Sequence, residues 1–338
     1  MRYVVSPFYP VSDNVDVSHR AGWARYAAQE LGAKLLTTQH MGLVADLKRG
    51  DELICYHGME FKGQMNLQSG LTDEILARVK RLLDAKKKGV KIYSLDVPMP
   101  NYGQLLGERG MDPTSSEALT KLCGSAGKIL TPNIRPKRLV IGDSHALSQY
   151  VPGSTIVRND SLTLYGALRR NDGLFQDTHV FGFEWDCVWN DVEVITAYYG
   201  NIDIRHHLYR QPDPKQAIKE LVDTYGKQLK IIQDRYQTEI EVIMPLPIED
   251  ESRQIPKSGW YKGAPFAGDW HMRHQIRLAM RDQLKRMCKR HGFHAYEHPR
   301  HFIEKDGKLS FDVMEKPRSV HIRPAEYRLI QEGHEWVA

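Results

Sequence analysis

Cysteine is scarce in this chain of 338 residues, and its placement excludes two common uses of thiols. The four cysteines, at positions 55, 123, 187 and 288, are scattered, and none belongs to a Cys-x-x-Cys pair. Zinc modules and disulfide frameworks space their cysteines closely and regularly. We therefore expect no metal site, no disulfide bond and a reducing, cytoplasmic location.

Long apolar runs are also missing. No stretch approaches the ~18 consecutive apolar residues that cross a bilayer. The first residues, MRYVVSPFYPV, enter a strand-like run without the separate apolar region and cleavage site of a signal peptide. Lys and Arg number 47 and Asp and Glu 42, with no long basic run. We expect no membrane association and no nucleic-acid partner.

Glycine-rich phosphate loops of the GxGxxG and GxxxxGK[ST] types are absent, so no nucleotide cofactor is expected. Strand-like and helix-like segments do alternate along the chain, which is typical of parallel α/β folds. The expected strands lie at 1–8, 34–38, 52–56, 90–95, 138–142, 178–183, 192–199, 239–246 and 293–297. The expected helices lie at 18–31, 72–88, 215–236 and 270–291.

The alternation is interrupted between residues 98 and 136, where Gly and Pro are frequent and strand signals are few. We place a domain boundary there. The expected units are a smaller α/β domain at 1–110, a linker at 111–135 and a second α/β domain at 136–338.

Three polar motifs follow apolar segments of the second domain. The first is GDSH at 142–145, which follows the strand-like run RLVI and precedes a helix expected near Ala146. This arrangement puts the hydroxyl of Ser144 at the carboxyl edge of a parallel sheet, where ligands bind in such folds. Taken alone, GDS is more often a simple turn.

The second motif is GNID at 200–203, after the apolar run VITAYY, and the third is SVHIRPAEY at 319–327. The amide of Asn201 could donate to an oxyanion, although an ordinary turn with a side-chain hydrogen bond explains the same residues. The lone His321 is more often a structural residue than a base.

Taken in order, these Ser, Asn and His motifs resemble the blocks of the SGNH (GDSL-like) hydrolase superfamily. The resemblance covers about residues 136–330 and includes VIMPLPIED at 242–250, which is similar to the fourth strand of that fold. It implies a three-layer, flavodoxin-like α/β/α domain with a central parallel sheet. The N-terminal third of the chain is not covered.

The resemblance implies that Ser144 attacks an acyl carbonyl while His321 takes its proton. The Ser144 backbone N–H and the Asn201 amide would bind the oxyanion, and Gly166 or Asn159 would supply a further donor. Neighbouring motif residues, Asp143, His145 and Gly200, would line the substrate site.

The chain departs from the family pattern at Arg318, where an Asp three residues before the histidine is usual. An acid there orients the imidazole, whereas an Arg disfavours the imidazolium. Nearby carboxylates at Asp312, Glu315 and Glu326 could replace it, and among these we prefer Glu315. A backbone carbonyl could also orient the ring, leaving a Ser–His dyad.

Basic and aromatic residues near these motifs suggest a polar substrate. Arg205, Arg318 and Arg323 could form a pocket for a carboxylate, a phosphate or an anionic sugar. Ion pairs within the fold would explain Arg205 equally well. Trp260 lies in a long loop at 249–268, and loops of this length are often functional.

Three functions remain open. The leading hypothesis is a serine esterase or deacylase that hydrolyses or transfers an acyl group, such as an O-acetyl group on a sugar or another polar ester. The first alternative is a carbohydrate- or nucleotide-modifying transferase that uses the N-terminal domain. The second is a catalytically degenerate binding protein on the same scaffold, for which Arg318 is the main reason.

Overall fold

The structure is a computed structural model, and it describes most of the second half of the chain and short segments of the first half. The described residues are 1–5, 28, 32–36, 43–55, 81, 84–94, 96–97, 138–149, 151, 154–159, 162–175, 192–252, 255, 262–263, 265–315, 318–323 and 326–328.

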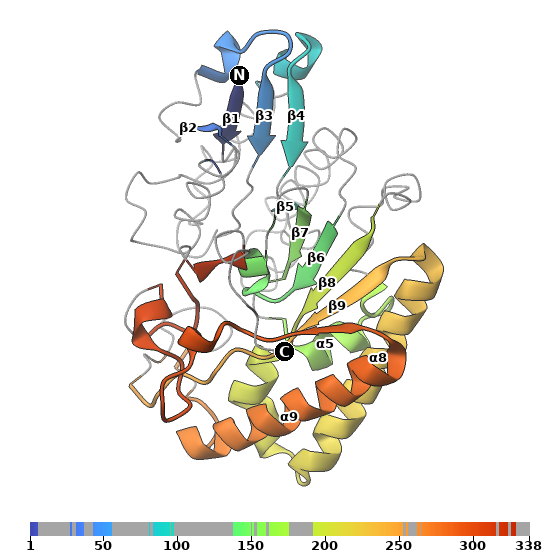
Figure 1. The fold of residues 1–338 in the computed structure, drawn as a ribbon, viewed down its shortest axis with the longest axis vertical. Coiled ribbons are helices and arrows are strands. Elements are labelled where there is room, and N and C mark those ends of the chain that lie inside the picture. The colour runs from blue at the N-terminus through green and yellow to red at the C-terminus, as the bar shows by residue number, and fades with distance from the viewer. Residues whose placement is uncertain are drawn as a thin grey trace.

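The first of two parallel sheets comes from the N-terminal part and has the strand order β2-β1-β3-β4 (Figure 1). All three strand pairs in it are parallel. Its strands are β1 (Arg2–Val5), β2 (Lys34–Leu36), β3 (Glu52–Cys55) and β4 (Lys91–Ser94).

The second sheet has six strands in the order β10-β9-β8-β6-β7-β5, and its pairs are all parallel. The predicted α/β fold with parallel sheets is therefore confirmed. The strands are β5 (Asp96–Val97), β6 (Arg138–Gly142), β7 (Ser154–Arg158), β8 (Val194–Tyr198), β9 (Glu239–Ile243) and β10 (His294–Tyr296).

Two long helices, α8 (Pro214–Tyr236) and α9 (Trp270–His291), lie side by side against one face of the six-stranded sheet (Figure 1). Each begins at an aspartate whose carboxylate accepts backbone N–H groups of the first turn, Asp213 for α8 and Asp269 for α9. Such caps satisfy donors that the helix leaves without partners. The helices expected at these positions are confirmed.

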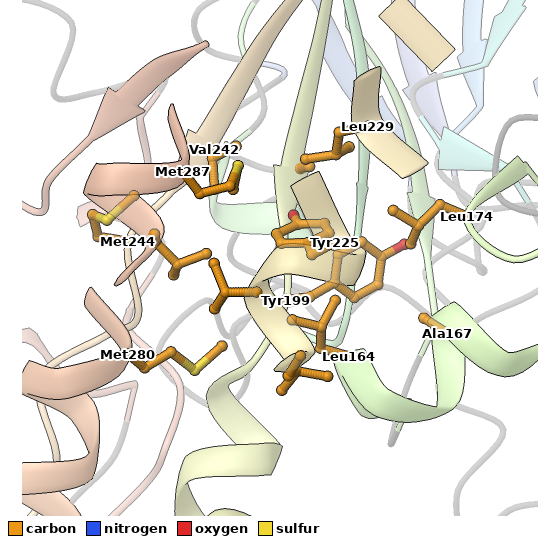
Figure 2. Close-up of a cluster of buried hydrophobic side chains, with 14 of the residues drawn as sticks. Leu164, Ala167, Leu174, Tyr199, Tyr225, Leu229, Val242, Met244, Met280 and Met287 are labelled. Carbon is orange, nitrogen blue, oxygen red and sulfur yellow. The ribbon is translucent and has the colours of Figure 1, made fainter. Parts of the chain in front are cut away.

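A continuous apolar core joins this face of the sheet to the helices, including the short helix α5 (Leu164–Arg169). Figure 2 shows Tyr199, just after β8, beside Tyr225 of α8, and their rings meet edge to face with centroids 6.3 Å apart. Met280 and Met287 of α9 belong to the same cluster. The core fixes where β8 ends, and with it the turn that follows.

The opposite face of the sheet has its own apolar cluster. Val140 of β6 packs there with Phe302 and Tyr327 from the C-terminal segments, while its neighbours along the strand point into the first core. Val4 and Ile54 of the four-stranded sheet belong to this second cluster. The C-terminal segment that carries His321 is thereby anchored to the sheet.

Among the elements not predicted from the sequence are a strand and a short α-helix of the larger domain. Strand β7 has a β-branched run, Thr155-Ile156-Val157, bounded by Pro-Gly and Asn-Asp pairs, which is a recognisable strand signal. Helix α5 is only six residues long, and Thr163 caps it. The helix expected near Ala146 is a single 3-10 turn, η3 (Ala146–Gln149).

Some predictions concern residues that the structure does not describe. The strand expected at 178–183 and the linker at 111–135 lie outside the described residues, as do most of the helices expected at 18–31 and 72–88. Strand β5 falls within the range assigned to the N-terminal domain but pairs with β7 of the larger sheet. The domain boundaries stay predictions.

Candidate active site

The turn after β6 places Ser144 at the carboxyl edge of the larger sheet. Gly142 is required there because an added Cβ would lie 2.4 Å from the carbonyl oxygen of Tyr198 on the neighbouring strand. The Asp143 backbone N–H donates to that same oxygen at 3.1 Å. This close approach of two strand ends holds the loop in place. Ser144 is partly exposed between two buried residues, Asp143 and His145.

His321 lies directly against Ser144. Its Nε2 is 2.8 Å from the Ser144 Oγ, although the residues are 177 positions apart in sequence. The imidazole is about one-fifth exposed, so a substrate can reach it. A serine hydroxyl at hydrogen-bond distance from an imidazole nitrogen is the arrangement needed to activate a nucleophile.

A short antiparallel ladder holds the other side of His321. Met314 and Ile322 form its central bridge, and the Glu315 N–H donates to the His321 carbonyl at 3.0 Å. Residues directly opposite on such a ladder have neighbouring side chains. Accordingly, the His321 Nδ1 lies 3.7 Å from the Glu315 Oε1.

Ser319 completes the arrangement and was not foreseen from the sequence. Its hydroxyl donates to Glu315 Oε1 at 2.7 Å and accepts the backbone N–H of His321 at 3.1 Å. One side chain thus fixes both the carboxylate and the histidine backbone. A Ser two residues before the histidine is the only signal of this in the sequence, and it is a weak one.

Arg318 occupies the position where the family pattern has an acid, but its side chain is exposed and its φ is +67°. This left-handed conformation turns the chain between the two sides of the ladder. The carboxylate beside His321 is Glu315, which was the preferred substitute.

Asn201 and Gly200 differ from their expected roles. Asn201 is fully buried; its Oδ1 accepts the Leu246 N–H at 3.0 Å and its Nδ2 lies 3.5 Å from the Asp143 Oδ2. It braces the nucleophile loop rather than facing a substrate. Gly200 is buried with φ +100°, and an added Cβ would lie 2.4 Å from Met280 Cε, so helix packing explains it.

Gly166 is also corrected, because its N–H donates to the Thr163 hydroxyl at 2.8 Å as part of the α5 cap. That N–H cannot also serve an oxyanion. Asn159, the alternative donor, directly follows β7 beside the nucleophile strand, and its backbone N–H donates to the Gly142 carbonyl at 2.8 Å. Trp260 lies outside the described residues.

Arg205 does not line an open basic pocket. It is buried, and its Nε and Nη2 each lie 2.8 Å from a Glu249 carboxylate oxygen. Burial alone would lower the pKa of Arg205, but the facing Glu249 raises it above the ordinary value. This buried, bidentate ion pair holds the loops after β8 and β9 together. Arg323 is half-exposed and paired with Glu326 at 2.8 Å.

A cavity of about 680 Å³ lies between α5, α8 and the residues after Asn201. Asp203 lines it, and the carboxylate accepts the N–H groups of Leu164 and Tyr165 at 2.7 and 3.1 Å. Burial raises the pKa of Asp203 to about 6. The residue therefore ties α5 to the turn after β8 while its charge opposes burial.

Buried His298 contacts the carboxyl ends of β8 and β9. Its Nε2 lies 2.9 Å from the Met244 carbonyl oxygen and 3.1 Å from the Tyr198 hydroxyl. Burial lowers the pKa of His298 to about 3. The ring is therefore neutral at physiological pH and plays a structural part.

Among the residues that the structure describes, no group of three or more His, Cys, Asp or Glu side chains is arranged to hold a metal ion. Within the same residues, no helix combines the length and apolar character needed to span a membrane.

Neither a model of a known protein family nor a curated protein matches the chain. A number of solved structures are similar to it, among them three bacterial proteins. A Streptococcus pneumoniae protein named as a candidate platelet activating factor is 17% identical, with 60% of this chain and 83% of that one covered and a TM-score of 0.40.

The second, a candidate acylhydrolase from Bacteroides fragilis, is 12% identical over 60% of this chain and 85% of its own, with a TM-score of 0.39. The third, a GDSL-like lipase from Bacteroides thetaiotaomicron, is 10% identical over 58% and 84%, also with a TM-score of 0.39. These are broad likenesses of fold at low sequence identity.

Proposed function

We propose that the chain is a serine hydrolase of the SGNH type that acts on an acyl ester or N-acyl bond. The observation that carries this proposal is the 2.8 Å contact between Ser144 Oγ and His321 Nε2 at the carboxyl edge of a parallel sheet. Glu315 faces the other imidazole nitrogen, so nucleophile, base and acid stand in the order that acyl transfer requires.

In the first half of the reaction, Ser144 Oγ bonds to the acyl carbon while its proton moves to His321 Nε2. The tetrahedral intermediate collapses when the bond to the leaving group breaks and His321 returns the proton to that group. An acyl-enzyme remains on Ser144. Glu315 stabilises the imidazolium that forms in both steps.

In the second half, a water molecule loses its proton to His321 and attacks the acyl-enzyme. The bond between the acyl carbon and Ser144 Oγ then breaks, and the acyl group leaves as a carboxylic acid. His321 returns the proton to Ser144. An alcohol in place of water would give acyl transfer by the same steps. The two outcomes differ only in which acceptor reaches the acyl carbon.

The oxyanion binds to two donors in this proposal. The first is the Ser144 backbone N–H, for which no acceptor is found among the residues described. The second is the side-chain amide of Asn159, which follows the strand next to the nucleophile strand. The Asn159 backbone N–H already donates to the Gly142 carbonyl. Removing one such donor costs about 3–4 kcal/mol of the barrier in well-studied enzymes.

The substrate is proposed to be a polar or anionic ester, such as an O-acetylated sugar. Arg318 is exposed and precedes His321 by three residues in the sequence, which makes its cation the candidate partner of an anionic substrate group. Arginine suits carboxylate, phosphate and sugar groups because its planar head donates several hydrogen bonds.

The test is hydrolysis of p-nitrophenyl acetate and butyrate by the wild type, Ser144→Ala and His321→Ala, with a fluorophosphonate label on each protein. We expect turnover and labelling in the wild type, with both lost in Ser144→Ala. His294→Ala is the matched control, because His294 lies on the exposed edge strand β10. A wild type that neither turns over an ester nor takes the label would overturn the proposal.

A further inference from the structure

We propose that His145 is a positioning residue that holds the base His321 against Ser144. This inference rests on the proposed function above. His145 follows the nucleophile directly, is 6% exposed and belongs to no step of the reaction as described. Its ring lies 4.7 Å from that of His321, between centroids.

Both ring nitrogens of His145 face oxygen atoms. Nδ1 is 2.9 Å from Asp143 Oδ1, and Nε2 is 3.1 Å from the backbone carbonyl oxygen of Val320. A carbonyl oxygen only accepts hydrogen bonds, so Nε2 carries a proton. Because both nitrogens are engaged, His145 is unable to act as the general base for Ser144.

Asp143 is surrounded by donors. Its Oδ1 also accepts the His145 backbone N–H at 2.9 Å, and the Asn201 Nδ2 lies 3.5 Å from its Oδ2. These contacts suit a carboxylate, which accepts hydrogen bonds and donates none. The contact between Asp143 Oδ1 and His145 Nδ1 therefore orients the His145 ring so that its Nε2 faces the Val320 carbonyl.

The Val320 carbonyl is the atom through which His145 acts. It belongs to the peptide group that precedes His321, so fixing it fixes the start of the residue that carries the base. The two backbone polar groups of His321 itself are also held, its N–H by Ser319 Oγ and its carbonyl by the Glu315 N–H. The His145 contact joins this loop to the nucleophile loop, in addition to the Ser144–His321 contact.

Two of the contacts between these loops have different roles, one reactive and one structural. The reactive contact joins Ser144 to His321, and the structural contact joins His145 to Val320. A displacement of about 1 Å at a reacting pair can cost on the order of 100-fold in rate. The second contact limits such displacement without touching the substrate.

The experiment compares His145→Phe, which keeps a ring but has no donor, with His145→Gln, whose amide can donate to Val320. On p-nitrophenyl acetate, we expect kcat of His145→Phe to fall about 10- to 100-fold with KM within twofold of wild type. His145→Gln should recover at least half of that loss on a logarithmic scale. His294→Phe is the control. Equal losses in both variants, or a loss that follows the fall in Tm alone, would overturn the positioning role.

A second measurement does not depend on activity. In protein labelled with 15N-histidine, we expect Nε2 of His145 to carry a proton, because it faces the Val320 carbonyl oxygen, with the signals assigned by their absence in His145→Gln. An Nε2 without a proton would overturn the inference even if the enzyme is active. If the wild type shows no turnover and no label, the proposed function fails, and NMR still reports separately whether His145 Nε2 carries its proton.

Discussion

Glu315 and His321 face each other across a two-stranded antiparallel ladder, with the carboxylate Oε1 3.7 Å from the imidazole Nδ1. The pairing comes from the backbone, since the Glu315 N–H donates to the His321 carbonyl. The proposed acid of the triad therefore precedes the histidine by six residues and lies on the opposite strand.

This relationship predicts the effect of Glu315→Gln. The amide can present an N–H to the histidine and so favour the tautomer that protonates the wrong nitrogen. We expect kcat toward p-nitrophenyl acetate to fall on the order of 100-fold with KM little changed, which is less than the ~10,000-fold seen for a tightly bonded triad acid. Glu304→Gln, at an exposed position, is the control. Unchanged turnover in Glu315→Gln would show that the histidine works without an acid.

A second prediction concerns Arg318, where the family pattern has the acid. Because the side chain is exposed and Glu315 already faces the imidazole, Arg318→Asp should change kcat less than fivefold. Arg318→Gly should stabilise the protein by about 1 kcal/mol, since glycine adopts φ +67° without strain. Urea denaturation measures the second effect. A large gain in kcat from Arg318→Asp would assign the acid role to position 318.

A third prediction tests the close contact of two strand ends. Gly142→Ala would put a Cβ 2.4 Å from the Tyr198 carbonyl oxygen, and a backbone atom moves only with its strand. We expect a loss of about 3 kcal/mol in the free energy of unfolding. Gly292→Ala, with φ +72° and nothing within 4 Å of the new Cβ, should cost only about 1 kcal/mol. Equal losses at the two positions would mean that backbone conformation, not the contact, decides.

A fourth prediction follows from the pKa of Asp203. Burial raises this pKa from an ordinary 3.8 to about 6, so between these values the folded protein keeps a proton that the unfolded chain has released. The stability contribution is therefore present at low pH and is lost as pH rises from about 4 to about 6. The loss amounts to about 3 kcal/mol.

The measurement compares the wild type with Asp203→Asn by urea denaturation at pH 4, 5, 6 and 7. The variant has no charge to bury, so the difference between the two proteins should shift in its favour as pH rises. At every pH the variant also loses some stability. Each Asp203 oxygen accepts one backbone N–H, from Leu164 or Tyr165, whereas an asparagine has a single oxygen to accept them. A pH-independent difference would mean that the Asp203 carboxyl group titrates normally.

The sequence by itself determined the parallel α/β fold and the positions of the long helices. Apolar runs of strand length and a 3.6-residue apolar period are local signals, so α8, α9 and strands such as β6 and β9 could be predicted. Ser144 and His321 were singled out for the same reason, since each stands in a short motif with its own flanking pattern.

Only the tertiary structure decided which side chains meet. The Ser144–His321 contact and the Glu315–His321 pairing depend on how separate segments pack, and neither follows from spacing along the chain. The same holds for Arg205, whose sequence neighbours do not include its partner Glu249. The sequence pattern around a charged residue is the same whether the residue lines a pocket or is buried in an ion pair. The difference depends on desolvation and on contacts between segments distant in the sequence.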